Sequence, residues 1–182
     1  MQDEFTQALK ERDLEAVDRL FDEWPELLYF RNEQGASAIA LCVYHGFPEG
    51  AERIIGRGRR PDVFEAAMLG RLDILAEVPT ADLIAPDGFP LLGLAVFFGQ
   101  HEAVRYLLEK GADVNLAAKN ATRVAAVHAA AARRDVATMR LLIEHGADVN
   151  ARQQNDYTPL RAAREQGDEA MVELLVAHGA VE

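Results

Sequence analysis

The chain has 182 residues and is 49% hydrophobic, enough for one compact domain or an array of five or six repeated units, which excludes a disordered chain. Its 30 acidic and 19 basic residues give a formal net charge of −11, which disfavours nucleic-acid binding because contacts to phosphates need positive charge. No run approaches the ~18 apolar residues of a membrane span, and the first residues lack the features of a secretory signal. The single cysteine, Cys42, excludes an intrachain disulfide. We therefore expect a cytoplasmic protein that binds neither nucleic acid nor membrane.

Repeated segments divide the chain into units. Leucine-rich segments that end in Gly-Ala recur at Gly111, Gly146 and Gly179, at intervals of 35 and 33 residues. This period is typical of repeats built from a turn and two helices. A second marker lies before each segment, and its pattern extends back to the start of the chain at Arg12, Gly46, Gly70, Gly99, Arg134 and Gly167. The markers predict one domain of six units, approximately residues 1–30, 31–60, 61–82, 83–115, 116–150 and 151–182.

Each unit is predicted to hold two helices. The inner helices are short and rich in alanine, at residues 65–69, 129–132 and 161–163 in chain order, which predicts a concave wall of closely packed inner helices. The outer helices carry apolar residues at positions i, i+3 and i+4, which bury one face. These positions are Val104, Leu107 and Leu108, then Met139, Leu142 and Ile143, then Val172, Leu175 and Val176. The fold class predicted is an all-α solenoid of about six helix-turn-helix units with short β-turn fingers.

One finger is predicted to be missing. Only Arg59, Arg60 and Pro61 lie between Gly58 and Asp62, too few residues for a hairpin turn with its flanking strands. We expect this segment to connect two helices directly, with Pro61 at or near the start of the next helix, where its absent N–H is harmless.

The motifs of these units resemble the ankyrin-repeat family from end to end. The resemblance rests on Thr158-Pro159-Leu160 and on Gly-Ala-Asp-Val-Asn at residues 111–115 and 146–150. Residues 61–67, 86–91 and 97–99 also resemble a group of small bacterial ankyrin proteins. Two units depart from the family pattern. The fifth keeps His128 but has alanines in place of Thr-Pro, and the sixth has Arg161 in place of histidine. The resemblance implies a scaffold that recognises another protein through its concave inner-helix surface and its finger tips.

Candidate partner-binding residues precede the markers of successive units. Apolar side chains at these positions, with a polar rim that includes Arg133, predict a binding hot spot on the concave face. The four apolar candidates are Tyr44, Met68, Phe97 and Phe98. The alternative for the two phenylalanines is that one of them packs between units as ordinary core. Phe89 and Tyr157, at fingertip positions, are further candidates.

A local basic run, Arg53, Arg57, Arg59 and Arg60, coincides with the missing finger. It could hold an anion or an acidic segment. The alternative, which we favour, is a set of solvated cations near a helix C-terminus, where positive charge complements the helix dipole.

Catalytic residues are scarce in this sequence. Ser37 is its only serine and begins a predicted inner helix. Cys42 and His45 are spaced as nucleophile and base could be, but Cys42 replaces a core alanine, and a buried thiol is inert. His145 and His178 lie in adjacent units, too far apart to share a zinc ion. We therefore expect no enzyme, no cofactor, no metal and no small-molecule substrate.

The function predicted is a non-catalytic, monomeric module that binds another protein. Two alternatives stay open at this point, a self-associating structural module that uses the apolar patch, and a thiol enzyme that uses Cys42 and His45.

Overall fold

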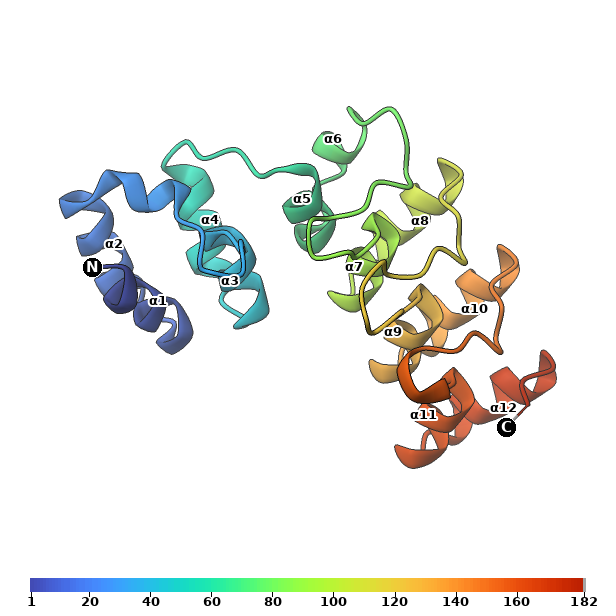
Figure 1. Ribbon diagram of the computed structural model, residues 1–182. Coiled ribbons are helices and arrows are strands. Elements are labelled where there is room, and N and C mark those ends of the chain that lie inside the picture. The colour runs from blue at the N-terminus through green and yellow to red at the C-terminus, as the bar shows by residue number, and fades with distance from the viewer. Residues whose placement is uncertain (182) are drawn as a thin grey trace. The chain divides into compact units, whose positions relative to one another are not determined.

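The computed structural model describes residues 1–181, and these residues contain twelve α-helices and two 3₁₀ helices (Figure 1). Contacts divide the chain into two compact units, residues 1–65 and 66–182. The predicted all-α class is confirmed. Along residues 1–181, no helix is long and apolar enough to cross a membrane.

The N-terminal unit contains two helix pairs. They are α1 (Gln2–Glu11) with α2 (Leu14–Glu23), and α3 (Ala38–Tyr44) with α4 (Pro48–Gly56); the 3₁₀ helix η1 (Pro25–Tyr29) follows α2. Side-chain caps start two of these helices, since Asp13 accepts from the N–H of Ala16 at 2.9 Å and Ser37 accepts from that of Ala40 at 3.1 Å. Helix α1 packs on α3, and α2 packs on α4.

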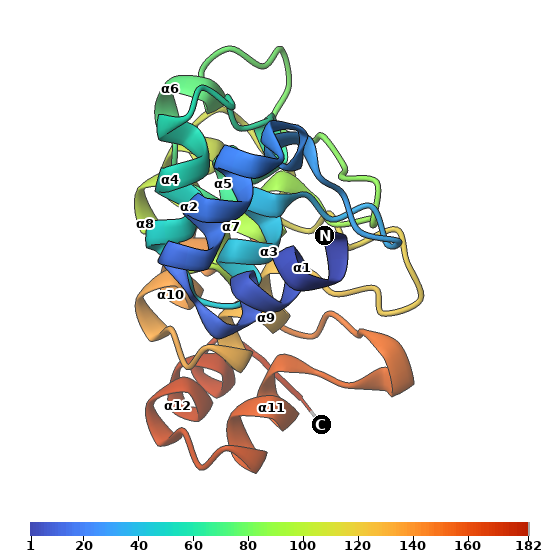
Figure 2. The ribbon, with the colours of Figure 1, turned by 90° about the vertical axis from the view of Figure 1, so that its left-hand side faces the viewer.

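The C-terminal unit contains two rows of helices (Figures 1 and 2). The inner row is α7 (Leu91–Phe97), α9 (Ala126–Ala132) and α11 (Pro159–Glu165), and the outer row is α8 (His101–Glu109), α10 (Val136–Glu144) and α12 (Glu169–Ala177). Consecutive helices of each row are in contact. Before them come α5 (Val63–Leu69), which crosses the boundary between the two units, and the short α6 (Leu72–Leu75); η2 (Gln154–Asp156) precedes α11.

The predicted outer-helix stripe is buried at most of its positions. Val104, Leu107, Leu108, Met139 and Leu142 are all buried. The expectation does not hold for Ile143 and Val172, which are half-buried, and it is wrong for Val176, half of which is exposed although Leu175 beside it is fully buried. For Val176 the reason is its place in α12, the last helix of the outer row, where position i+4 has no following outer helix among the described residues.

Asparagines of the Gly-Ala-Asp-Val-Asn segments join neighbouring repeats. The Nδ2 of Asn115 donates to the carbonyl of Gly146 at 3.1 Å, and its Oδ1 accepts from the N–H of Asp148 at 2.8 Å. Asn150 repeats both bonds one unit later, to Gly179 at 3.0 Å and Val181 at 2.8 Å. The motif recurs because one amide side chain satisfies a donor and an acceptor of the next repeat.

Neighbouring fingers also contact each other through backbone hydrogen bonds. The N–H of Lys119 donates to the carbonyl of Gly88 at 2.8 Å, and Gln154 donates to Thr122 of the preceding finger at the same distance. Gly88 has a φ of 94°, and a Cβ there would lie 3.0 Å from the backbone of Lys119, so this position requires glycine. Antiparallel bridges close the fingers at Arg31 with Ser37 and at Ile84 with Pro90.

Residues 57–62 connect α4 to α5 without a hairpin, as predicted. No bridge lies within this segment of the described chain, and Pro61 stands two residues before α5 begins at Val63.

Candidate functional site

The inner wall of the C-terminal unit carries an aromatic pair beside an arginine, which we call the α7–α9 surface and define as Phe97, Phe98 and Arg133. Phe97 ends α7 and is 48% exposed, whereas Phe98 is half-buried. Their rings meet edge to face in a T-shaped arrangement, with centroids 5.0 Å apart. The Nη1 of Arg133 donates to the carbonyl of Phe97 at 2.9 Å. That bond satisfies a carbonyl at the end of α7 and holds the guanidinium at the C-terminal end of this helix.

The side chain of Met68 is buried and cannot contact a partner, so the prediction that Met68 belongs to the binding patch is wrong. It stands at the position equivalent to Phe97 but is only 4% exposed. Methionine has a flexible, unbranched side chain that folds into apolar gaps, whereas the rigid ring of Phe97 stands out from the wall. The carbonyl of Met68 accepts a bond from the Nε2 of Gln100 at 2.9 Å. Tyr44, at the end of α3 in the N-terminal unit, is 47% exposed.

Of the two fingertip candidates, Tyr157 belongs to a compact polar cluster. Its hydroxyl donates to Oε2 of Glu165 at 2.5 Å, and the guanidinium of Arg161 lies 5.0 Å from its ring centroid. Arg161 also donates from Nε to Oε1 of Glu165 at 2.9 Å. The hydroxyl bond lowers the pKa of Glu165 and raises that of Tyr157. Arg161, which departs from the family motif, thus orders this fingertip. Phe89 is half-buried at its own fingertip.

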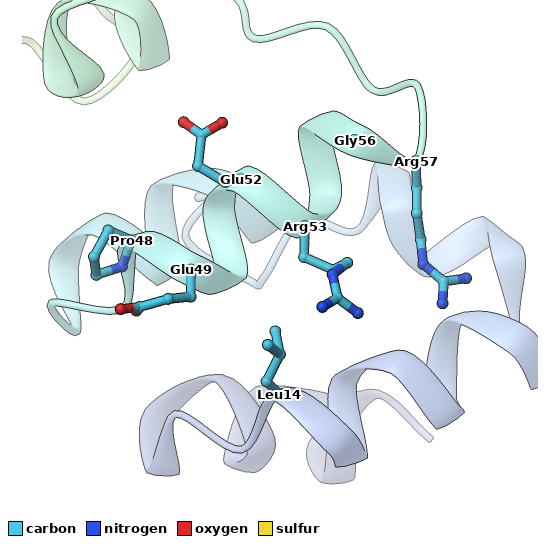
Figure 3. A pocket seen from close by; sticks show the side chains of 7 residues that line it. All are labelled: Leu14, Pro48, Glu49, Glu52, Arg53, Gly56 and Arg57. Carbon is cyan, nitrogen blue, oxygen red and sulfur yellow. The ribbon is translucent and has the colours of Figure 1, made fainter.

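Two arginines of the basic run line a groove of about 720 Å³ between α2 and α4 (Figure 3). Arg57 bonds to Oδ1 of Asp22 at 2.7 Å and to Oδ1 of Asp18 at 3.0 Å, and Arg53 is paired with Asp18 as well. The expectation that these cations are merely solvated is wrong. They form ion pairs with acidic side chains of α2.

Arg59 is buried in an ion-pair network that replaces the missing finger. Its Nη1 and Nη2 donate to Oε2 and Oε1 of Glu65 at 2.7 and 2.8 Å, and the hydroxyl of Ser37 also donates to Oε1. Glu65 further accepts from the N–H of Asp62 at 2.7 Å, while Oδ1 of Asp62 accepts from the N–H of Glu65 at 2.9 Å. This reciprocal pair is a capping box at the start of α5.

The predicted site residues do not include this network. The signal that could have revealed it is the spacing Asp-x-x-Glu at residues 62–65, which predicts a capped helix start. The network also explains the serine at position 37. Its oxygen caps α3 by accepting from Ala40, while its proton goes to Glu65.

Comparisons with known proteins agree with this architecture. Residues 92–181 match the family profile "Ankyrin repeats (3 copies)". The crystal structure of the ankyrin repeat domain of Bcl-3, from the IkappaB protein family, superposes with a TM-score of 0.59 and 25% identity, covering 98% of this chain and 86% of that one. Residues 92–181 therefore match ankyrin repeats, and the fold of the chain is that of an ankyrin-repeat domain.

Curated relatives come from animals and from a bacterium. A mouse B-cell lymphoma 3 protein homolog is 28% identical over 149 residues, 82% of this chain and 30% of that protein. A putative ankyrin repeat-containing protein of Treponema pallidum is 39% identical over 94 residues, 51% of this chain and 31% of that protein. A rat ankyrin repeat and SAM domain-containing protein 6 is 33% identical over 105 residues, 55% of this chain but 12% of that protein. The chain therefore spans less than a third of the length of each relative.

The ankyrin histidine that this chain retains has a structural role. His128 is buried in α9, where its Nδ1 accepts from the N–H of Ala125 at 3.1 Å and its Nε2 lies 3.0 Å from the carbonyl of Ala151. This geometry requires a neutral imidazole, donating from Nε2. Burial lowers the pKa of His128 below 6.5, in spite of bonds to backbone carbonyls and the charge of Asp148.

The lowered pKa predicts a pH-dependent stability. Below pH 6.5 the unfolded chain binds a proton at His128 that the folded state resists, so the stability that is present above pH 6.5 is lost as the pH falls toward the folded pKa. The urea midpoint, followed by circular dichroism, should decrease between about pH 7 and pH 5. His128→Gln should flatten this decrease, whereas His145→Gln, an exposed change, should retain it. Equal slopes in both variants would contradict the assignment to His128.

Cys42 has the properties of a core residue. Its side chain is buried in α3, and burial raises the pKa of the thiol to about 12, so almost no nucleophilic thiolate exists at neutral pH. This burial argues against the thiol-enzyme alternative. Ankyrin-repeat domains are generally non-catalytic. Among residues 1–181, no group of three or more histidine, cysteine or acidic side chains could hold a metal ion.

Proposed function

We propose that this ankyrin-repeat protein is a non-catalytic module that binds another protein through the α7–α9 surface. The observation that carries the proposal is the exposure of Phe97, whose ring packs on Phe98 and whose carbonyl accepts a hydrogen bond from Arg133. Large aromatic side chains are mostly buried in monomeric proteins, and an exposed ring beside an arginine has the composition of an interface hot spot. Phe89, Tyr157 and Tyr44 are proposed as further contacts.

The geometry of the inner wall supports this proposal. The neighbouring inner helix α9 consists mainly of alanine, and its last residue, Ala132, is exposed at the position equivalent to Phe97. A small side chain at that position leaves room for a partner to reach the ring of Phe97. The packed side chains of the inner and outer helices lie behind this wall, so the exposed positions can differ in sequence without disturbing the core.

The proposal includes the origin, the compartment, the class of partner and the oligomeric state of the protein. We propose a bacterial cytoplasmic protein; the resemblance to small bacterial ankyrin proteins and the relative in Treponema pallidum support the bacterial origin. The net charge of −11 supports a protein partner over a nucleic acid. We propose a monomer, because the α7–α9 surface is assigned to a partner and not to a second copy.

Phe97→Ala tests the proposal. Affinity purification from the native host, followed by mass spectrometry, would identify the partner, and titration of that partner would give the dissociation constant. We expect Phe97→Ala to weaken binding by about 2 kcal/mol, roughly 30-fold, because truncation of a hot-spot ring removes buried contact area.

Two controls lie on outer helices. Glu173→Ala removes an exposed charge from α12, and Tyr106→Ala removes a half-buried aromatic ring from α8. Both should bind within about twofold of the wild type, provided that their thermal unfolding shows an intact fold. Equal affinities for Phe97→Ala and Tyr106→Ala would refute the proposed surface. Loss of a concentration-dependent dimer in Phe97→Ala would instead support self-association.

A further inference from the structure

A second exposed aromatic feature lies in the N-terminal unit, around η1. Tyr29 is 72% exposed, the largest exposed fraction of any large apolar side chain among residues 1–181, and Trp24 directly before the helix is 38% exposed. Neither belongs to the inner-helix wall. We call Trp24, Glu26 and Tyr29 the η1 edge.

The 3₁₀ geometry explains why these rings face outward. Residues three apart lie above one another in a 3₁₀ helix. Leu27 and Phe30 form one such pair and are buried, and Phe30 meets the ring of Phe5 edge-on at 5.5 Å. Glu26 and Tyr29 form the other pair, which is exposed. The buried pair therefore anchors the segment and holds a carboxylate and an aromatic ring side by side in solvent.

Charge determines what this edge can bind. Within residues 1–181, Glu23 and Glu26 have no ion-pair partner, whereas Asp18 and Asp22 of the same region are neutralised by Arg53 and Arg57. An aromatic face attracts a cation, and a neighbouring carboxylate pairs with it. Both elements of the η1 edge thus favour the same group, a guanidinium or an ammonium.

We propose that the η1 edge binds an arginine- or lysine-bearing segment of a partner protein, with the cation over Tyr29 and its charge paired to Glu26. This proposal is independent of the α7–α9 surface, because it uses other residues, in the other compact unit. The negative charge of the chain would draw a basic segment toward it, and the two rings would select where it binds.

The fluorescence of Trp24 tests the proposal directly, since it is the only tryptophan in the chain. The probe is a capped peptide of alternating glycine and arginine, titrated into the full chain at low salt, with a glycine–glutamate peptide of equal length as the control. We expect saturable quenching by the arginine peptide alone. Tyr29→Ala should raise the dissociation constant about two- to fivefold, the range of an exposed cation–π contact, and Tyr29→Phe should leave it unchanged.

Glu26→Gln and Glu15→Gln separate local pairing from general attraction. Both remove one exposed negative charge from the same region, but Glu15 lies in the first turn of α2, away from the η1 edge. We expect only Glu26→Gln to weaken binding, with an effect that fades at high salt. Equal effects of the two variants, an unchanged constant for Tyr29→Ala, or equal quenching by the glutamate peptide would each overturn the proposal.

Discussion

Replacing Glu65 with alanine should lower the free energy of unfolding of the N-terminal unit by about 3–5 kcal/mol. Glu65 accepts both guanidinium bonds of Arg59, and both side chains are buried. Its removal leaves the charge of Arg59 in a low-dielectric site and the hydroxyl of Ser37 without its acceptor. Urea unfolding monitored by Trp24 fluorescence measures the effect, because Trp24 lies in the same unit.

Two further variants make this result specific. Glu49→Ala removes an exposed carboxylate from α4 and should change stability by less than about 0.5 kcal/mol. The double change Arg59→Met with Glu65→Leu removes both charges together, and it should recover much of the loss because no unpaired charge stays buried. A loss below 0.5 kcal/mol in Glu65→Ala would contradict the buried ion pair.

Leu142→Ala should destabilise the C-terminal unit by about 2–5 kcal/mol, because the removed side chain leaves a cavity between packed helices. Leu142 is fully buried in α10, which contacts both α8 and α12. Leu141→Ala is the matched control, since it makes the same chemical change at a half-buried position of the same helix. Urea unfolding followed by circular dichroism compares the two. Equal losses would show that the outer-helix register is wrong.

The fold could be predicted from the sequence because the same structural motif recurs in several repeats. The spacing of Gly111, Gly146 and Gly179 marks the helix ends, and all three glycines have a positive φ. The connection at residues 57–62 was predictable by chain length alone. Both features depend on local backbone geometry, which the sequence specifies directly.

The surface was harder to predict because equivalent positions do not share an environment. Met68 and Phe97 have the same offset before their markers, yet one is buried and the other is exposed. The position of a residue in the repeat determines where its backbone lies. The conformation of its side chain, however, depends on neighbouring residues from other repeats. The basic run shows the same limit. The acidic residues that pair with Arg57 lie 35 and 39 residues away in the chain, so a local sequence pattern does not predict these ion pairs.

Photo-crosslinking from position 97 can show whether a partner protein lies against the α7–α9 surface. A benzophenone amino acid placed at Phe97, and in a second variant at Glu173 of α12, would be irradiated in the native host. We expect a crosslink to one partner protein from position 97, at the α7–α9 surface, and none to that protein from position 173. A crosslink of equal yield from both positions, or from position 173 alone, would contradict this expectation.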